Sequence, residues 1–349
     1  MTLSTLSSDT ALAFADRGPL SHAILSRLTG GEDSGGFDTS VLAADAVAAT
    51  ADIVHDDDIQ LALFLLYSSA YGSLPELDAD LEWDPALLTT RRILEDAFER
   101  ALRETVPMPE IPEPTVDAVG RALFALAAAD TGPSLSRYFA RKATTQQAEE
   151  MLRQRSIYTL READPHSWAI PRLEGRAKAA LVEIQSDEYG GGRPHRVHAV
   201  LFANAMRAAG LDAAYGAYVD EVPALTLASF NMMSMFGLNR RLVGAVVGHL
   251  AAFEMTSSIP CRLYADGLRR LGFDQDVVEY FDEHIEADAV HEQIAARDLA
   301  GGLAEDRPEL LADIMFGAAA CLTVDGWSGA HMLDAWSAGE SSLRRAATS

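Results

Sequence analysis

Apolar residues recur at steps of three and four along most of this chain, and runs of β-branched residues are rare. Steps of that size place side chains on one face of an α-helix, whereas a half-buried strand alternates at every second residue. Alanine and leucine, which are strong helix formers, dominate the sequence. The pattern therefore predicts an all-α fold with a buried helical core.

Two N-terminal segments carry recognisable helix boundaries. In VHDDDIQLALFLLYSSAYG, three aspartates precede an apolar run and Gly72 follows it, as expected at the start and end of a helix. PALLTTRRILEDAFERALRE is amphipathic and has a proline in its first turn. Four prolines then fall within VPMPEIPEPT, a density that no helix interior tolerates. We interpret 107–115 as a linker between an N-terminal helical region, 1–106, and a main domain, 116–349.

Beyond the linker, the sequence predicts one helix after another. Clusters of glycine, proline and polar residues predict breaks between them. These breaks are DTGP, ADPHSW, EYGGGRPH, AAGLD, SSIPC, RRLGFD and AGGLAEDRP.

Charge and cysteine content exclude several classes of function. The net charge is -24, which disfavours binding to nucleic acid or to an anionic membrane. Two cysteines supply neither a disulfide framework nor a thiolate metal site. Neither a signal peptide nor a membrane span is predicted, because the N-terminus lacks a basic stretch before an apolar run and no segment is long and uncharged enough. We expect a cytoplasmic protein.

The stretch FDEHIEADAVHE, 281–292, concentrates histidines and acids. His284 and Asp288 are four residues apart and share a helix face, with His291 one turn further along the same stripe. Asp282, Glu283 and Glu286 face elsewhere on such a helix. By itself the stretch also fits a solvated helix face, which is the commoner reason for a run of charges.

Carboxylates on other predicted helices favour a metal site. Glu254 lies in the apolar stretch GAVVGHLAAFEMTSS, where an unpaired carboxylate is costly. His249 is five residues away, on another face, and is interpreted as a core or supporting histidine. The candidate ligands are Glu162, Glu188, His198, Glu254, His284 and Asp288. Four carboxylates balance two divalent ions, and oxygen and nitrogen donors without sulfur suit iron or manganese.

These segments resemble the haem-oxygenase-like di-iron oxidases, also described as iron-containing redox enzymes. The resemblance covers roughly residues 116–340 and is carried by READPHSWAIPRL, KAALVEIQSDEYGGGRPHRVHA, GHLAAFEMTSSIP and FDEHIEADAVHE. It implies a haem-oxygenase-like helical bundle with an N-terminal helical extension, two Fe(II) ions, O2 as co-substrate and an external electron donor. It also implies oxidation of a small amino-acid-like or fatty-acid-like molecule, by N-oxygenation or by C–C or C–H chemistry, in secondary metabolism.

The resemblance also assigns roles to single residues. Glu188 and His198 match the family's helix glutamate and the following histidine, and Glu162 matches an upstream carboxylate. His195 is the alternative to His198. We prefer His198, because His198 lies on an inward-facing apolar helix. His291 and His195 are candidates for a supporting layer that orients the ligands.

Two other readings stay open: a metal-free enzyme on the same bundle, and a non-catalytic, acidic helical protein that binds iron or a partner. The apolar LALFLLY face makes a homodimer through the N-terminal helices a further hypothesis. Several arginines are candidates for binding a substrate carboxylate, although surface arginine is the commoner explanation. These are Arg172, Arg176, Arg193, Arg240 and Arg241.

Overall fold

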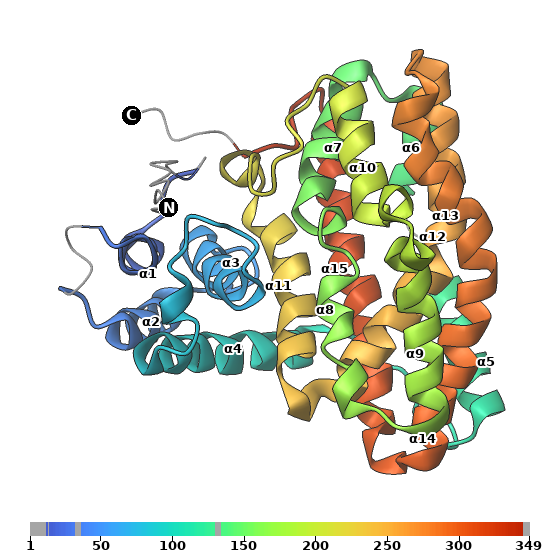
Figure 1. Cartoon of the computed structure of the whole chain (residues 1–349), viewed down its shortest axis with the longest axis horizontal. Coiled ribbons are helices and arrows are strands. Elements are labelled where there is room, and N and C mark those ends of the chain that lie inside the picture. The colour runs from blue at the N-terminus through green and yellow to red at the C-terminus, as the bar shows by residue number, and fades with distance from the viewer. Residues whose placement is uncertain (1–11, 13, 32–35, 130–133, 345–349) are drawn as a thin grey trace, which may run out of the picture.

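The computed structural model describes residues 12, 14–31, 36–129 and 134–344, and for 286–290 it describes the backbone alone. Every regular element within these ranges is a helix (Figure 1). The N-terminal helices are α1 (Pro19–Thr29), α2 (Thr39–Ala49), α3 (Asp57–Tyr71) and α4 (Pro85–Thr105). The longer helices that follow are α5 (Val116–Ala128), α6 (Leu135–Lys142), α7 (Thr145–Thr159), α9 (Gly175–Glu188), α10 (His198–Ala208), α11 (Ala224–Leu238), α12 (Val243–Leu271), α13 (Gln275–Gln293) and α15 (Leu311–Ser337).

The predicted boundaries of α3 and α4 are confirmed. Asp56 caps α3 by accepting the N–H of Ile59 at 2.9 Å, and Gly72 ends the helix in the left-handed conformation with φ 61°. α4 begins at Pro85. Residues 107–113, which include three of the four prolines, have no regular structure. Whether this linker separates two domains stays a prediction.

Two long helices, α12 and α15, cross at the centre of the bundle through glycine. A Cβ on Gly248 would lie 1.8 Å from the carbonyl oxygen of Ile314, and one on Gly317 would lie 2.0 Å from that of Ala245. Only glycine permits so close an approach of two helix backbones. The crossing holds α12, which carries Glu254, at a fixed distance from the rest of the core.

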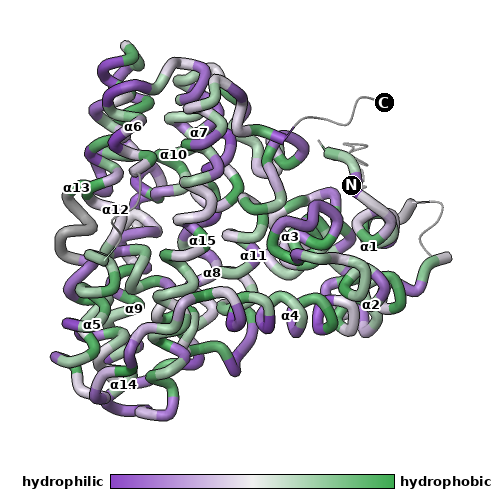
Figure 2. Tube along the Cα trace, turned by 180° about the vertical axis from the view of Figure 1, so that it is seen from behind, coloured by the Kyte–Doolittle hydropathy of each residue, from purple (hydrophilic) through white to green (hydrophobic). Residues whose placement is uncertain are grey.

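α11 joins the N-terminal helices to the bundle, because it lies between α3 and α15 in both views (Figures 1 and 2). Phe64 of α3 packs on Phe230 of α11, with ring centroids 6.0 Å apart. The amide of Asn231 donates to the backbone oxygen and to Oε1 of Gln60, both at 2.8 Å. One continuous hydrophobic core therefore runs through the N-terminal helices and the bundle.

The structure corrects one predicted break and places another at the C-terminal end of its predicted segment. SSIPC lies inside α12, where Pro260 is accommodated without ending the helix. Proline in a helix interior removes one hydrogen bond, and here the packing of a 29-residue helix outweighs that loss. The glycines of AGGLAEDRP lie in a π-helical turn, Ile294–Gly301, and in α14 (Gly302–Asp306). The chain leaves helical geometry only at Arg307.

Two helical stretches, Arg240–Leu271 and Pro308–Ser337, are long and apolar enough to cross a membrane. Their most apolar windows are 67% and 61% buried inside the bundle. Burial of that kind is what central helices of a helical core require, so length and composition alone carry little weight here.

Candidate metal centre

Five segments that are distant in sequence meet inside the bundle. Glu162 follows α7, Glu188 ends α9, His198 begins α10, Glu254 lies on α12, and α13 carries His284 and His291. The turn between α9 and α10 is built by three consecutive glycines with positive φ. A side chain at the first of them would lie 2.7 Å from the backbone nitrogen of residue 197, so glycine lets the chain double back there.

Four buried side chains form a first group of donor atoms. One atom from each of Glu162, Glu188, His198 and His284 lies within 4.8 Å of all the others. Nδ1 of His198 is 2.9 Å from Oε2 of Glu188. The imidazole rings of His198 and His284 are 4.4 Å apart between centroids. Two carboxylates and two imidazoles at these separations can hold one divalent ion.

A second group shares a residue with the first. Donor atoms of Glu188, Glu254 and His291 also lie within 4.8 Å of one another, and all three residues are buried. Nδ1 of His291 is 3.4 Å from Oε2 of Glu254. On its other side, Nε2 of His291 bonds Oδ2 of Asp187 at 3.0 Å. Glu188 therefore belongs to both groups of donor atoms.

Neighbouring groups fix the orientation of the first group. The Tyr280 hydroxyl donates to Oε2 of Glu162 at 2.7 Å. Nδ1 of His284 lies 2.8 Å from the carbonyl oxygen of Tyr280, which can only accept, so Nδ1 carries the proton. Nε2 of His284 is then left with a lone pair for an ion.

Several donor atoms of the centre lack a hydrogen bond. Oε1 of Glu162 is buried without a hydrogen-bond partner among the described residues, and Nδ1 of His198 and of His291 lie near carboxylate oxygens without a well-aligned hydrogen bond. Leaving buried polar atoms unsatisfied costs roughly 1–3 kcal/mol each. Bound ions would satisfy them, so the donor set fits a metal.

Without ions, the electrostatics of the centre favour extra protons. Burial alone would lower the pKa of His198, but the adjacent Glu188 carboxylate outweighs it and raises that pKa to about 9. Burial would also lower the pKa of His291, but Glu254 and Asp187 outweigh it and raise that pKa to about 9. Burial, with repulsion from Glu188, raises the pKa of Glu162 to about 8.

A pair of buried histidines lies beside the centre. Nε2 of His166 and Nδ1 of His249 are 3.1 Å apart and share a hydrogen bond. Burial lowers the pKa of His166 to about 4 and that of His249 well below its usual value, so both rings are neutral. His249 thus sits in the core with a partner, as the sequence indicated, and His166 lines the pocket.

The structure brings together five of the six predicted ligands: Glu162, Glu188, His198, Glu254 and His284. The side chain of the sixth, Asp288, lies outside the described part of the structure. Their role as ligands stays a prediction.

The supporting roles of His291 and His195 stay predictions. His291 stands among the donor atoms of the second group rather than behind them. His195 is exposed in the 3-10 turn Pro194–Arg196 and belongs to neither group of donor atoms.

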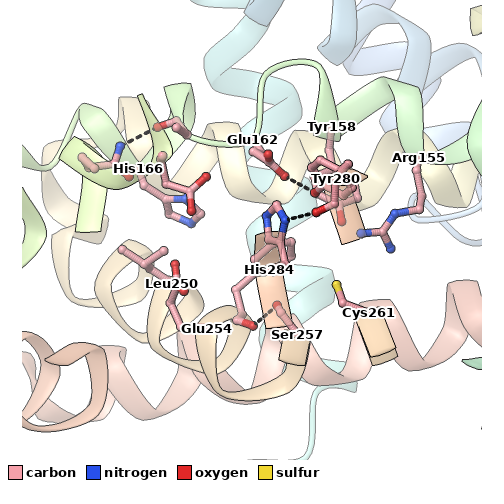
Figure 3. Close-up of a pocket in the computed structure, with 14 residues that line it drawn as sticks. Arg155, Tyr158, Glu162, His166, Leu250, Glu254, Ser257, Cys261, Tyr280 and His284 are labelled. Atoms are coloured by element: carbon pink, nitrogen blue, oxygen red, sulfur yellow. Dashed lines mark hydrogen bonds between the residues drawn. The ribbon is translucent and has the colours of Figure 1, made fainter. Parts of the chain in front are cut away.

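Sequence reasoning missed His166, Tyr280 and Arg155, which all line the pocket (Figure 3). Helical spacing would have indicated one of them, since Tyr280 precedes His284 by four residues. The pocket also contains Phe253 and Ser257 of α12, and its free volume is about 30 Å³. That is room for roughly one or two water-sized particles.

Comparison with known proteins identifies a matching family and one curated relative. The sequence profile of a family described as iron-containing redox enzyme matches residues 149–326, just over half of the chain. Nitrosourea synthase from Streptomyces achromogenes subsp. streptozoticus is 28% identical over 146 residues, which make up 42% of this chain and 31% of that protein. The chain thus spans about a third of the length of the curated relative that it matches.

A crystal structure of a CADD-like protein of unknown function from Nostoc punctiforme PCC 73102 is also similar. It is 16% identical, with a TM-score of 0.49 over 64% of this chain and 97% of the other. A second crystal structure of that protein gives 18% identity and the same TM-score.

The chain belongs to the family of iron-containing redox enzymes. The resemblance identified from the sequence motifs is therefore confirmed, and so is the all-α, haem-oxygenase-like helical fold. The buried cluster of glutamates and histidines supports iron binding.

Proposed function

We propose that this protein is an O2-dependent, non-haem di-iron oxidase or oxygenase that acts on a small molecule. One observation carries the proposal: two groups of buried donor atoms adjoin each other and share Glu188. A single ion would need only one of them. Two ferrous ions, when bound, supply the reductive activation of dioxygen that such chemistry requires.

Charge balance supports a pair of divalent ions. Three carboxylates of the centre belong to Glu162, Glu188 and Glu254, and the sequence predicts Asp288 as the fourth. Four carboxylates offset the four positive charges of two ferrous ions, which avoids the cost of uncompensated buried charge. Glu188 would bind both ions, and His198, His284 and His291 would supply neutral nitrogen donors.

The surrounding residues orient the centre and limit the access of water. Tyr280 holds Glu162 through its hydroxyl and fixes the tautomer of His284 through its backbone oxygen. Phe253 and Leu250 supply the apolar part of the pocket wall. A pocket of this small size would keep reactive chemistry at the centre away from bulk solvent.

The named relative supports oxidation of nitrogen as one form of this chemistry, since a nitrosourea carries an oxidised nitrogen. An amino-acid-like or fatty-acid-like substrate, a place in secondary metabolism, an external electron donor and a cytoplasmic location complete the proposal.

Aerobic addition of Fe(II) to the metal-free protein tests the proposal. We expect two irons bound per chain and a transient visible absorption band after exposure to O2. A metal-free enzyme on the same bundle would give neither, and an iron-binding protein without catalysis would bind iron and give no transient band. Either of those results would overturn the proposal.

A further inference from the structure

We propose that Arg155 anchors the carboxylate of the substrate, so that the pocket selects a small-molecule carboxylate and presents its other end to the donor groups. The inference rests on the proposed function of the same pocket. Arg155 lies on α7 and lines the pocket at the opposite end from His166 and Leu250 (Figure 3).

Arg155 lacks the partners that its neighbours have. Among the described residues, no carboxylate lies within 4.0 Å of its guanidinium and it donates no hydrogen bond, and its Nε is shut off from solvent without a partner. The flanking arginines are paired: Arg153 with Glu221 at 2.9 Å, and Arg161 with Asp164 at 3.2 Å. An unpaired guanidinium beside a pocket is costly unless something that enters the pocket binds it.

Aromatic rings surround Arg155 and leave its donors unused. The guanidinium carbon lies 5.3 Å from the ring centroid of Tyr158, 5.6 Å from that of Tyr264 and 6.0 Å from that of Phe281. Contacts with ring faces stabilise the positive charge, but they accept none of the N–H groups at the edge of the guanidinium plane. A carboxylate accepts two of those N–H groups in parallel, and the rings make the site partly apolar, which strengthens the pair.

Arg155 stabilises the ionised form of Glu162 through space, but no hydrogen bond or ion pair joins it to the described donors of the metal centre. Glu162 is the acidic residue of the centre nearest to Arg155 along the chain, yet its Oε2 is bonded by Tyr280 and not by the guanidinium. Figure 3 shows Tyr158 and Tyr280 between Arg155 and Glu162. The guanidinium therefore lines the same pocket as the described donors and keeps its N–H groups free of them.

The arginines predicted from the sequence have other roles or positions. Arg172 donates to the backbone oxygen of Leu238 at 2.8 Å, and Arg241 is paired with Glu99. Arg176, Arg193 and Arg240, like these two, do not line the pocket. Arg155 is the arginine that does.

A bound substrate must widen the pocket, whose free volume is about 30 Å³. The wall that can yield is α12. The hydroxyls of Thr256 and Ser257 bond back to the carbonyls of Ala252 and Phe253, at 2.7 and 2.6 Å, and Pro260 follows within the same helix. Back-bonding hydroxyls and an internal proline both weaken a helix locally and allow it to bend.

Affinity selection with the full-length protein tests the inference. The probes are the proteinogenic amino acids and the straight-chain alkanoic acids from butanoic to dodecanoic acid, each beside its primary amide. They are offered to metal-free protein and to protein loaded with redox-inert Zn(II). We expect at least one acid to bind, with its amide and the Arg155→Gln variant each weakening binding by roughly tenfold or more. Arg153→Gln, on the same helix, should bind like the unmodified protein.

Three results would overturn the inference: no acid bound in either form, an amide bound as tightly as its acid, or Arg155→Gln binding unchanged. If Arg155→Gln unfolds, Arg155→Lys is used for the test. Lysine keeps the positive charge but lacks the paired N–H donors of the guanidinium, so this variant should weaken binding to an intermediate degree. Iron content and the absorption band of the variants separate this inference from the proposed function. If the protein binds no iron but still binds an acid through Arg155, only the di-iron proposal is overturned.

Discussion

The centre holds protons at the positions where it is proposed to hold cations. Glu188 raises the pKa of His198 and, together with burial, that of Glu162, while Glu254 and Asp187 raise that of His291. A proton and a metal ion compete for the same lone pairs. Metal binding to this site is therefore coupled to proton release.

Proton release is the first prediction. With pKa values of about 9 for His198 and His291 and about 8 for Glu162, each is mainly protonated at neutral pH. Binding of Fe(II) or Mn(II) should release a proton from each of them, and the apparent affinity should rise as the pH increases toward 9. Anaerobic calorimetry in two buffers of different ionisation enthalpy measures the release. An affinity independent of pH would show that these residues do not bind the metal.

The same shifts set the stability of the metal-free protein, and the sign follows from where the protons are held. His198 and His291 bind protons more tightly in the folded chain, so the stability that they contribute is complete below pH 6.5 and is lost as the pH rises through about 9. We expect the melting temperature of metal-free protein to fall between pH 7 and 9. Divalent metal should raise it more at pH 9 than at pH 6, which thermal scans with and without Mn(II) would check.

The shared carboxylate gives another prediction. Glu188→Gln removes a negative charge from both donor groups, so it should abolish most of the binding of both irons, whereas Glu254→Gln should mainly affect one. Glu183→Gln is the matched control, since Glu183 is exposed on the same helix. Iron analysis after desalting measures the outcome. Two irons retained by Glu188→Gln would refute the bridging role.

Residue types and helical spacing predicted much of this site. Glu254 stood out as a carboxylate among apolar residues, and His284 stood on a helix face four residues from Asp288. The sequence could not show that His291 reaches Glu254, because that contact depends on how α12 and α13 are rotated against each other. Arg155 was missed for a related reason, since having no partner is a property of three-dimensional surroundings.

At the scale of elements, glycine decides how closely the central helices approach. Periodicity predicted helices across most of the chain, and the aspartates and Gly72 indicated where α3 begins and ends. The crossing of α12 and α15 through Gly248 and Gly317 could not be predicted, because a glycine in a helical pattern reads only as a weak helix former. Pro260 predicted a helix break that the structure does not have, because the packing of α12 outweighs the tendency of proline to end a helix.

Substitution of Gly248 tests the crossing. In Gly248→Ala, the new Cβ would meet the carbonyl oxygen of Ile314 at 1.8 Å, and we expect a loss of roughly 1–3 kcal/mol or more in the free energy of unfolding. Gly326→Ala on α15 is the control, because nothing lies within 4 Å of that Cβ and alanine favours a helix. Denaturant unfolding compares the two. Equal stability of both variants would mean that the crossing tolerates separation.

At the scale of the whole molecule, the N-terminal helices are part of the core. The side chains of LALFLLY are all buried within the chain, mostly by the packing of α3 against α1, α4 and α11. They are therefore not available as the dimer surface for which they were a candidate. A homodimer stays a prediction, without that face as its basis.

Truncation decides whether 116–349 is a domain in its own right. Removing 1–106 would expose Phe230 and leave Asn231 without Gln60, along with the rest of the α11 face that α3 covers. Exposed apolar surface of that kind leads to aggregation. We expect the fragment to aggregate or to bind an apolar dye, and to unfold at a lower temperature than the full chain. A monomeric fragment that melts like the full chain and binds the same iron would instead establish the two-domain division, since the centre itself draws every described donor from residues beyond the linker.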